Sequence, residues 1–308
     1  MSEKKNNTNF ESVAIVTITF NSSHVIEQFI YSLNKSEFIN FKLFFIDNYS
    51  TDNTIKLIEK KANFDFEIIK NKTNKGVASA NNIGIKLAID QSFKKIILSN
   101  NDIYFSSNVI GDLLKFHSSN CNDIVTTKIM YSYDHKKIWY CGGFFNFSKG
   151  LVPEHIGIGK SDFGQFDHIK NSSYAPTCFV LFNSKIFSEI GFMDEKYFVY
   201  FDDTDFFYRI RKNGKYKLSI NQKIKIFHKV GSSTSENNLK KLKSNFFIRQ
   251  NIQNHFYFLK KNERLYFYLF IPFLFIKYNL RIILTNQYKF NFNTLLLVNK
   301  SIFKGILK

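Results

Sequence analysis

The run Val13-Ala14-Ile15-Val16-Thr17-Ile18-Thr19-Phe20 decides the fold class of this 308-residue chain. Its residues are apolar or β-branched throughout, which is typical of a strand buried on both faces. Asn21-Ser22-Ser23 ends the run, and apolar residues then recur at helical spacing between residues 25 and 33. We therefore predict a buried strand followed by a helix.

The same alternation continues as far as residue 102. Further strands are predicted at Phe41–Ile46, Phe66–Ile69 and Lys95–Leu98, and helices are predicted after Ser50-Thr51-Asp52 and over Gly76–Ala88. Strands that alternate with helices form βαβ units and a parallel sheet. The predicted fold class is α/β, with a Rossmann-like, mostly parallel central sheet and flanking helices.

Polar residues follow three of the predicted strands, at Thr19–Asn21, Asp47–Asn48 and Asn100–Asp102. The carboxyl ends of parallel strands meet at one edge of the sheet, where ligands bind. Each group alone could be an ordinary turn, since Asn and Asp are common turn residues. Three groups at the same edge favour a ligand pocket.

Two common nucleotide-binding signatures are missing from the sequence. No G-x-G-x-x-G follows the first strand, and no G-x-x-x-x-G-K-[ST] occurs anywhere. The sequence therefore argues against a dinucleotide-binding protein and against a P-loop protein. The segment from Asn74 to Gly84 is rich in small residues, which tight packing of a helix on a sheet would explain. Packing does not explain Asn81 and Asn82, which are poor helix formers in a helix interior.

An acidic stretch stands out in a chain of net charge +18, with five carboxylates between Asp194 and Asp205. Like charges this close repel, so a fold keeps them only with cations nearby or with a task to perform. The alternative is a solvated loop that caps a helix starting near Thr204, because Asp favours the first turn.

Taken in order, these motifs resemble a family 2 glycosyltransferase of the GT-A fold, close to the rhamnosyltransferase-like branch. The resemblance runs from about residue 13 to residue 233 and rests on the segments 16–21, 46–52, 74–84, 98–102 and 191–195, on Asp202-Asp203-x-Asp205 with Arg209 and Gly214, and on His228 with Ser232. It implies an inverting enzyme of bacterial surface polysaccharide assembly. The sugar would pass from a nucleoside-diphosphate sugar to a glycan or lipid-linked acceptor.

The resemblance also implies roles for individual residues. Those that would bind or shape the nucleotide-sugar pocket are Thr19, Asn21, Asp47, Asn74, Gly76, Asn81, Asn100 and Asn101. Asn100-Asn101-Asp102 stands where the family carries an Asp-x-Asp motif, so Asp102 would hold a divalent metal, Mg²⁺ or Mn²⁺. The motif's first position is Asn, which leaves more of the metal binding to Asp102. His228 would complete the metal shell, although a lone histidine at a strand end is usually structural.

For catalysis the resemblance implies Asp203 as the general base and Asp202 as a residue that holds the acceptor. Asp205 would brace the loop or cap the next helix. These residue types suit the chemistry. A diphosphate leaving group needs its charge neutralised, and displacement at the anomeric carbon needs a base for the acceptor proton. Neighbouring carboxylates raise one another's pKa, which helps a base to act near neutral pH.

The C-terminal quarter carries most of the basicity, since residues 239–308 contain 13 Lys or Arg and a single acid, Glu263. Within it, Leu265–Ile276 is an apolar and aromatic run of 12 residues, shorter than the roughly 20 that cross a bilayer. Flanking lysines and arginines predict an interfacial helix on anionic lipid. The alternative is a helical hairpin packed on the catalytic domain.

We predict three regions: a disordered tail (1–11), a GT-A catalytic domain (12–235) and a basic, aromatic helical region (236–308). The domain would comprise a nucleotide-binding half (12–105) and an acceptor half (106–235). Three cysteines, Cys121, Cys141 and Cys178, without a C-x-x-C suit a reducing compartment, so we expect a cytoplasmic protein, peripheral on the inner face of the plasma membrane. The alternatives are a nucleotidyltransferase and a basic nucleic-acid-binding protein. No nucleic-acid recognition motif is visible, and no nucleic-acid partner is expected.

Overall fold

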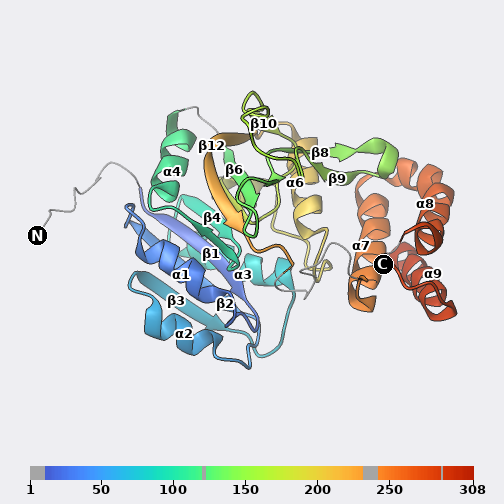
Figure 1. Cartoon of the computed structure of the whole chain (residues 1–308), viewed down its shortest axis with the longest axis horizontal. Coiled ribbons are helices and arrows are strands. Elements are labelled where there is room, and N and C mark those ends of the chain that lie inside the picture. Colours follow the sequence, from blue (N-terminus) through green and yellow to red (C-terminus); the bar gives the residue numbers. More distant parts are fainter. Residues whose placement is uncertain (1–10, 120–122, 232–241, 286) are drawn as a thin grey trace, which may run out of the picture.

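The computed structural model describes residues 11–119, 123–231, 242–285 and 287–308. Most of the predicted tail, Cys121, Ser232 and the predicted boundary at 235/236 lie outside these residues. The described chain confirms the α/β class, with helices on the faces of a central sheet (Figure 1).

The N-terminal half of the sheet is entirely parallel, as predicted. Its strands are β1 (Val13–Thr19), β2 (Phe41–Asp47), β3 (Asp65–Lys70) and β4 (Lys95–Ser99), in the order β4-β1-β2-β3. The connecting helices are α1 (Ile26–Asn34), α2 (Thr54–Lys61) and α3 (Val77–Asp90). Val13 pairs with Phe41 and Thr19 with Asp47, so the carboxyl ends of β1 and β2 lie level.

The second half of the sheet is mixed, and of its strands the sequence indicated the one that ends at His228. The main order is β10-β12-β6-β11-β4-β1-β2-β3, in which β11 (Phe179–Asn183) is antiparallel to both of its neighbours. Two further strands lie off this path, since β5 pairs with β12 and β7 with β6. The remaining elements up to residue 228 are β5 (Ile103–Phe105), α4 (Val109–Ser119), β6 (Ile124–Tyr131), β7 (Ile138–Tyr140), β8 (Gly143–Asn146), a 3-10 turn (Phe147–Lys149), β9 (Val152–His155), β10 (Asn171–Ser172), α5 (Lys185–Glu189), α6 (Asp202–Asn213) and β12 (Leu218–His228).

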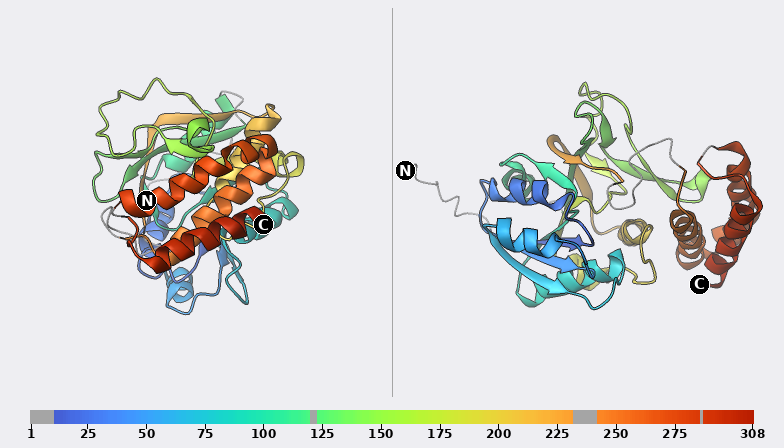
Figure 2. Two further views of the ribbon diagram at one scale, coloured as in Figure 1. Left: turned by 90° about the vertical axis from the view of Figure 1, so that its right-hand side faces the viewer. Right: turned by 60° about the horizontal axis from the view of Figure 1, so that its bottom comes forward.

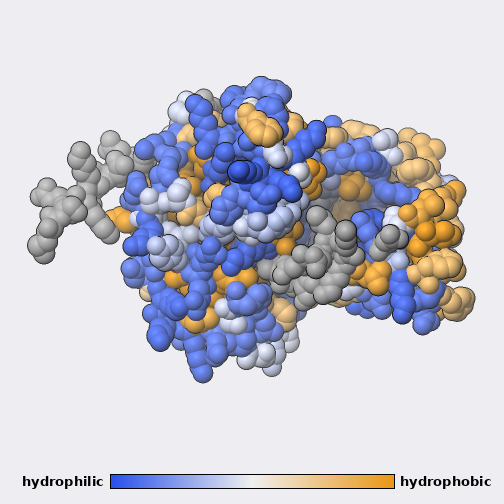
Figure 3. Space-filling model, viewed as in Figure 1, coloured by the Kyte–Doolittle hydropathy of each residue, from blue (hydrophilic) through white to orange (hydrophobic). Residues whose placement is uncertain are grey.

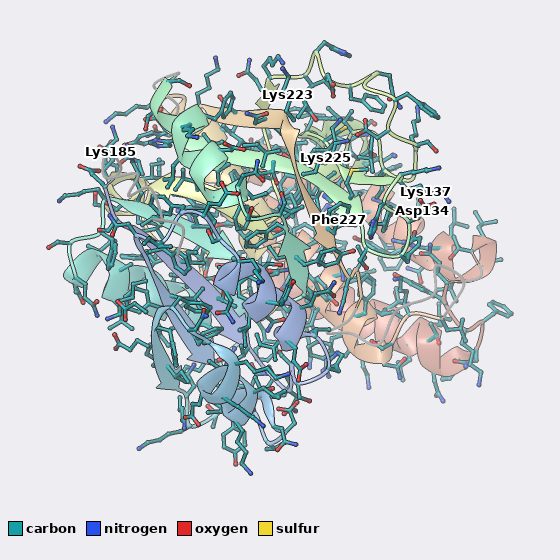
Figure 4. All side chains as sticks on the ribbon, turned by 60° about the vertical axis from the view of Figure 1, so that its left-hand side comes forward. Asp134, Lys137, Lys185, Lys223, Lys225 and Phe227 are labelled. Atoms are coloured by element: carbon teal, nitrogen blue, oxygen red, sulfur yellow. The ribbon has the colours of Figure 1, made fainter. Side chains whose placement is uncertain are left out.

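Strand β12 carries a predicted site residue at its end. Lys223, Lys225 and Phe227 follow one another along one face of the strand (Figure 4), while the alternating residues 224, 226 and 228 are buried on the other face. His228 pairs with Ile103 of β5, the strand that begins directly after Asp102. The alternation therefore turns His228 inward, next to the chain that leaves β4.

Three helices form the C-terminal region: α7 (Asn245–Asn262), α8 (Arg264–Leu284) and α9 (Phe292–Leu307). They lie side by side at one end of the molecule (Figure 2). The predicted length of the apolar helix is wrong, because α8 continues through Pro272 and past the apolar run to 21 residues. Within the described chain it is the one helix that is long and apolar enough to cross a membrane, judged by length and composition.

Candidate active site

Thr19 and Asp47 meet at the carboxyl ends of β1 and β2. The Thr19 hydroxyl donates to Asp47 Oδ1 at 2.8 Å, and the Ser50 backbone N–H donates to Asp47 Oδ2 at 2.9 Å. Asn21 takes a positive φ of 48°, and its Oδ1 accepts from the Thr51 backbone N–H at 2.8 Å. The structure thus brings these three predicted residues to one edge of the sheet, in a network that holds the turn after β1 against the turn after β2.

Gly76 is a point of close approach between the N-terminal half and the acidic stretch. Its φ is 83°, and a Cβ there would lie 2.4 Å from the Phe198 carbonyl oxygen. Asn74 Oδ1 accepts from the Gly76 N–H at 2.9 Å, and the Val77 N–H donates to the same Phe198 carbonyl at 2.7 Å. A glycine is required here because a side chain has no room and the backbone is left-handed.

The paired asparagines of α3 hold the acidic stretch. Asn82 accepts from the Met193 N–H at 3.0 Å and donates to the Met193 carbonyl at 2.9 Å. Asn81 Nδ2 lies 3.6 Å from Met193 Sδ. These contacts explain why two poor helix formers stand inside a helix. The role of Asn81 in a nucleotide pocket stays a prediction.

The three residues after β4 point in different directions. Asn101 donates to the Ile18 carbonyl at 2.7 Å and to Ser22 Oγ at 2.8 Å, which ties it to the end of β1. Asn100 Nδ2 contacts Cys178 Sγ at 3.2 Å. Asp102 turns instead to His228, with 3.2 Å between Oδ1 and Nε2, and both side chains are nearly buried. The two predicted metal ligands are therefore neighbours.

His228 lies in a largely aromatic and sulfur-containing environment. The ring centroid of Trp139 is 4.6 Å from its own, edge to face, and Cys178 Sγ is 3.5 Å from Nδ1. Burial disfavours a charged imidazole, but the Cys178 sulfur and the Asp102 carboxylate outweigh burial and raise the pKa of His228 well above its usual value. Burial also raises the pKa of the Cys178 thiol, which keeps the thiol neutral. The negative charge that stabilises a protonated His228 is therefore that of the Asp102 carboxylate.

The acidic pair Asp202-Asp203 follows a strained turn. Tyr200 and Phe201 have φ values of 64° and 67°, a region that non-glycine residues seldom occupy. Asn254 of α7 donates to the Val199 carbonyl at 2.9 Å and to the Tyr200 carbonyl at 3.0 Å. Strain of this kind persists where the surroundings impose it, often at functional sites.

The two carboxylates of the pair have different environments. Asp203 is partly exposed, and it accepts from the Tyr174 hydroxyl at 2.8 Å and from the Thr204 N–H at 2.6 Å. Asp202 is 4% exposed. Burial raises the pKa of both groups, and for Asp202 the neighbouring Asp203 charge raises it further, well above the usual value. Backbone N–H groups lower the pKa of both, but the hydroxyl donors, those of Tyr174 and Thr204, bind Asp203.

Asp205 braces the loop and does not cap α6. It is fully buried inside the helix and accepts from Arg209 Nε and Lys261 Nζ, both at 2.9 Å. Lys261 also binds Asp194 Oδ2 at 2.8 Å. These ion pairs offset the repulsion expected between the carboxylates of the acidic stretch. The sequence did not indicate Lys261, Asn254 or Tyr174; the polar residues of α7, placed among buried aromatics, were the available signal.

Comparisons with known proteins identify relatives of this chain in sequence and in fold. The family model for glycosyl transferase family 2 matches residues 14–191, more than half of the chain. The low-salt glycan biosynthesis hexosyltransferase Agl10 of Haloferax volcanii is 22% identical over 214 residues, and the alignment covers 68% of this chain but only 64% of that relative.

Two solved glycosyltransferase structures share the fold. S. aureus TarS (residues 1–349) in complex with UDP-GlcNAc has a TM-score of 0.60 at 14% identity, covering 96% of this chain and 81% of that one. The mannosyltransferase PcManGT of Pyrobaculum calidifontis, solved with GDP-Man and Mn²⁺, has a TM-score of 0.57 at 12% identity, covering 95% and 74%. The rhamnosyltransferase-like branch stays a prediction. The chain belongs to glycosyl transferase family 2 and has a GT-A fold.

Proposed function

We propose that this protein is an inverting glycosyltransferase that moves a sugar from a nucleoside-diphosphate sugar to a glycan or lipid-linked acceptor, with Asp203 as general base. The observation that carries the proposal is the Asp202-Asp203 pair at the start of α6. The Asp203 carboxylate is partly exposed, has a raised pKa and accepts hydrogen bonds from Tyr174 and Thr204. A base of this kind suits proton removal near neutral pH.

The donor would bind along the edge formed by β1, β2 and β4. Thr19, Asn21 and Asp47 would meet the nucleoside, while Asn74 and Gly76 shape the wall nearest the acidic stretch. Asn100 and Asn101 would position the chain that carries Asp102. The support is their gathering at the carboxyl ends of parallel strands, where α/β folds bind ligands. The solved neighbours hold UDP-GlcNAc and GDP-Man, which favours a nucleotide sugar as donor.

Asp102 and His228 fit the protein part of a divalent metal site. They supply one carboxylate and one imidazole 3.2 Å apart. No group of three or more His, Cys, Asp or Glu within the described ranges could hold a metal by itself. Mg²⁺ is commonly held by one or two carboxylates together with substrate phosphates, so we propose that the diphosphate completes the site. Bound there, Mg²⁺ or Mn²⁺ would neutralise the leaving group.

The transfer itself is a single displacement. Asp203 takes the proton of the acceptor hydroxyl as its oxygen bonds to the anomeric carbon. The bond from that carbon to the diphosphate oxygen breaks, and its electron pair leaves with the nucleoside diphosphate. Asp202, kept neutral by burial and by the charge of Asp203, would donate a hydrogen bond to the acceptor. One displacement without a covalent intermediate inverts the anomeric configuration.

An anionic membrane surface is the proposed location of the reaction. The end of the molecule formed by α8 and α9 is strongly apolar (Figure 3), and its large exposed side chains include Leu265, Leu269, Ile283, Leu284, Phe292, Phe303 and Leu307. Neither helix contains an acid. Lys277 of α8 donates to the Lys149 carbonyl at 3.0 Å, and Tyr266 donates to the Phe147 carbonyl, so these two bonds tie the helix to the segment between β8 and β9. This favours a helix lying on the membrane over one that spans it.

We propose that the enzyme works on the cytoplasmic side of the membrane, in bacterial surface polysaccharide assembly, with a hexose or deoxyhexose donor. The deciding experiment compares the wild type with Asp203→Asn on a panel of nucleoside-diphosphate sugars with Mn²⁺. We expect the variant to lose 10²-fold or more in turnover, by the usual worth of about 10²–10⁴ for a general base, while binding the donor as the wild type does. Wild-type turnover by the variant would exclude Asp203 as the base, and pyrophosphate as product would indicate a nucleotidyltransferase.

A further inference from the structure

Tyr174 makes a hydrogen bond to the proposed base from a segment far away in sequence. It lies between β10 and β11, is 5% exposed, and its hydroxyl donates to Asp203 Oδ2 at 2.8 Å. Burial and the Asp203 charge raise the pKa of the Tyr174 phenol well above its usual value, so the phenol keeps its proton and remains a donor.

The surroundings of Tyr174 hold it in one position. Its carbonyl accepts from the Tyr140 hydroxyl at 2.8 Å and from Ser172 Oγ at 2.6 Å. Its ring stacks on His155, with centroids 5.8 Å apart and an interplanar angle of 26°. A Cβ on Gly143 would lie 3.0 Å from its Cδ1. Backbone and ring are both fixed, so the hydroxyl arrives at Asp203 already oriented.

Several titratable groups face this hydrogen bond. Asp202 lies beside Asp203 on α6, and Cys178 approaches from the chain before β11 with its thiol pKa raised by burial. His155, behind the Tyr174 ring, has its pKa lowered to about 4 by burial and is neutral at pH 7. Asp205 is engaged by Arg209 and Lys261. Among these groups, the remaining question near neutral pH is therefore which member of the Asp202-Asp203 pair carries the negative charge.

We propose that Tyr174 is a positioning residue that makes Asp203, and not the adjacent Asp202, the ionised member of the pair; the inference rests on the proposed role of Asp203 as base. Two neighbouring carboxylates that interact strongly titrate as a unit, and the one with more donors keeps the charge. Tyr174 binds Oδ2 while Thr204 binds Oδ1, which fixes the plane of the carboxylate. Oδ1 also accepts from the Thr204 hydroxyl at 3.2 Å. Each oxygen of a carboxylate has two lone pairs, so one lone pair remains on Oδ2 for the acceptor hydroxyl.

The first test needs no substrate. Urea unfolding is measured at pH 7.5 for the wild type, Tyr174→Phe, Asp203→Asn and the double variant. In this cycle we expect a coupling of about tenfold in the unfolding constant, which is about 1.4 kcal/mol. Phe preserves the ring and its packing, so the single variant should fold. A coupling below twofold would overturn the proposal.

The second test is the pH dependence of turnover with saturating nucleoside-diphosphate sugar. We expect Tyr174→Phe to move the acidic limb of kcat upward by about one pH unit, a tenfold loss below the limb, with rates near those of the wild type at high pH and an unchanged KM for the donor. Tyr208→Phe is the matched control, because the Tyr208 hydroxyl also donates to a carboxylate, Glu263 Oε1, at 2.8 Å. That variant should leave the limb in place.

The outcomes distinguish a failure of the positioning role of Tyr174 from a failure of the proposed function. In an active enzyme, an unmoved limb in Tyr174→Phe, or an equal loss of rate at every pH, would assign Tyr174 to packing alone and overturn its positioning role. If the wild type turns over no nucleoside-diphosphate sugar, the proposed function itself fails, and the catalytic purpose of the Tyr174 hydrogen bond fails with it.

Discussion

Replacing Lys261 by Met should loosen the loop that carries the proposed base. Lys261 of α7 binds Asp205 Oδ2 at 2.9 Å and Asp194 Oδ2 at 2.8 Å, and so joins the C-terminal region to both ends of the acidic stretch. Methionine keeps most of the apolar stem and removes only the charge. The variant therefore tests the ion pairs and not the packing.

The magnitude follows from burial. Asp205 is 0% exposed, and removing one partner of a buried ion pair costs about 3–5 kcal/mol when the other charge is left alone. Here Arg209 still binds Asp205, and the Lys261 side chain is 28% exposed, so both losses are smaller. We expect a loss of about 2–3 kcal/mol in the free energy of unfolding.

The assay is urea unfolding of Lys261→Met beside the control Lys212→Met. Lys212 also joins α6 to the end of α7, through Glu263 at 2.9 Å, but the two side chains are 51% and 32% exposed. Exposed pairs contribute about 0–1 kcal/mol, so the control should change little. Equal losses in the two variants would refute the reasoning, because burial would then not decide the strength of these pairs.

Three further predictions concern separate parts of the molecule. Gly76→Ala should destabilise the fold by at least about 2 kcal/mol, because its Cβ would lie 2.4 Å from the Phe198 carbonyl at a φ of 83°; thermal unfolding measures this, and a wild-type Tm would contradict it. The Asp162 side chain is 4% exposed, but its bonds to Lys128 and Lys225 outweigh this burial and lower its pKa from 3.8 to about 2. Its stabilisation should therefore be complete well above pH 4 and be lost as the pH falls through 4 to 2, and Asp162→Asn should remove this part of the acid dependence of unfolding. Leu269→Glu, on the exposed face of α8, should reduce co-sedimentation with anionic vesicles several-fold; binding equal to that of the wild type would exclude this face as the membrane contact.

The N-terminal half of the fold could be predicted because its signals are local. Buried strands such as Val13–Thr19 are continuous apolar runs, and the helices between them show their spacing within a few turns. Strand β11 has no such signal for its direction, since it lies between β4 and β6, far away in sequence. The length of α8 was missed for a related reason: packing against α7 and α9 carries the helix through Pro272 and beyond the apolar run.

The residues of the candidate site likewise fall into those that the sequence could place and those that it could not. Residues at strand ends, such as Asp47 and Asp102, could be placed because topology brings strand ends together. The hydrogen bond between Tyr174 and Asp203 spans 29 positions and follows no periodicity, so only the folded chain shows it.

The match to the family model ends at residue 191, before the proposed base. Beyond that point, contacts made to the segment from 192 to 205 position Asp203. Asn82 and Gly76 contact this segment from the N-terminal half of the chain, while Asn254 and Lys261 hold it from α7. Because α7 also packs against α8 and α9, it contacts both the helices with the exposed apolar face and the loop with the acidic pair. A change in α7 should then alter turnover as well as membrane binding, whereas a change on the outer face of α8 should alter membrane binding alone.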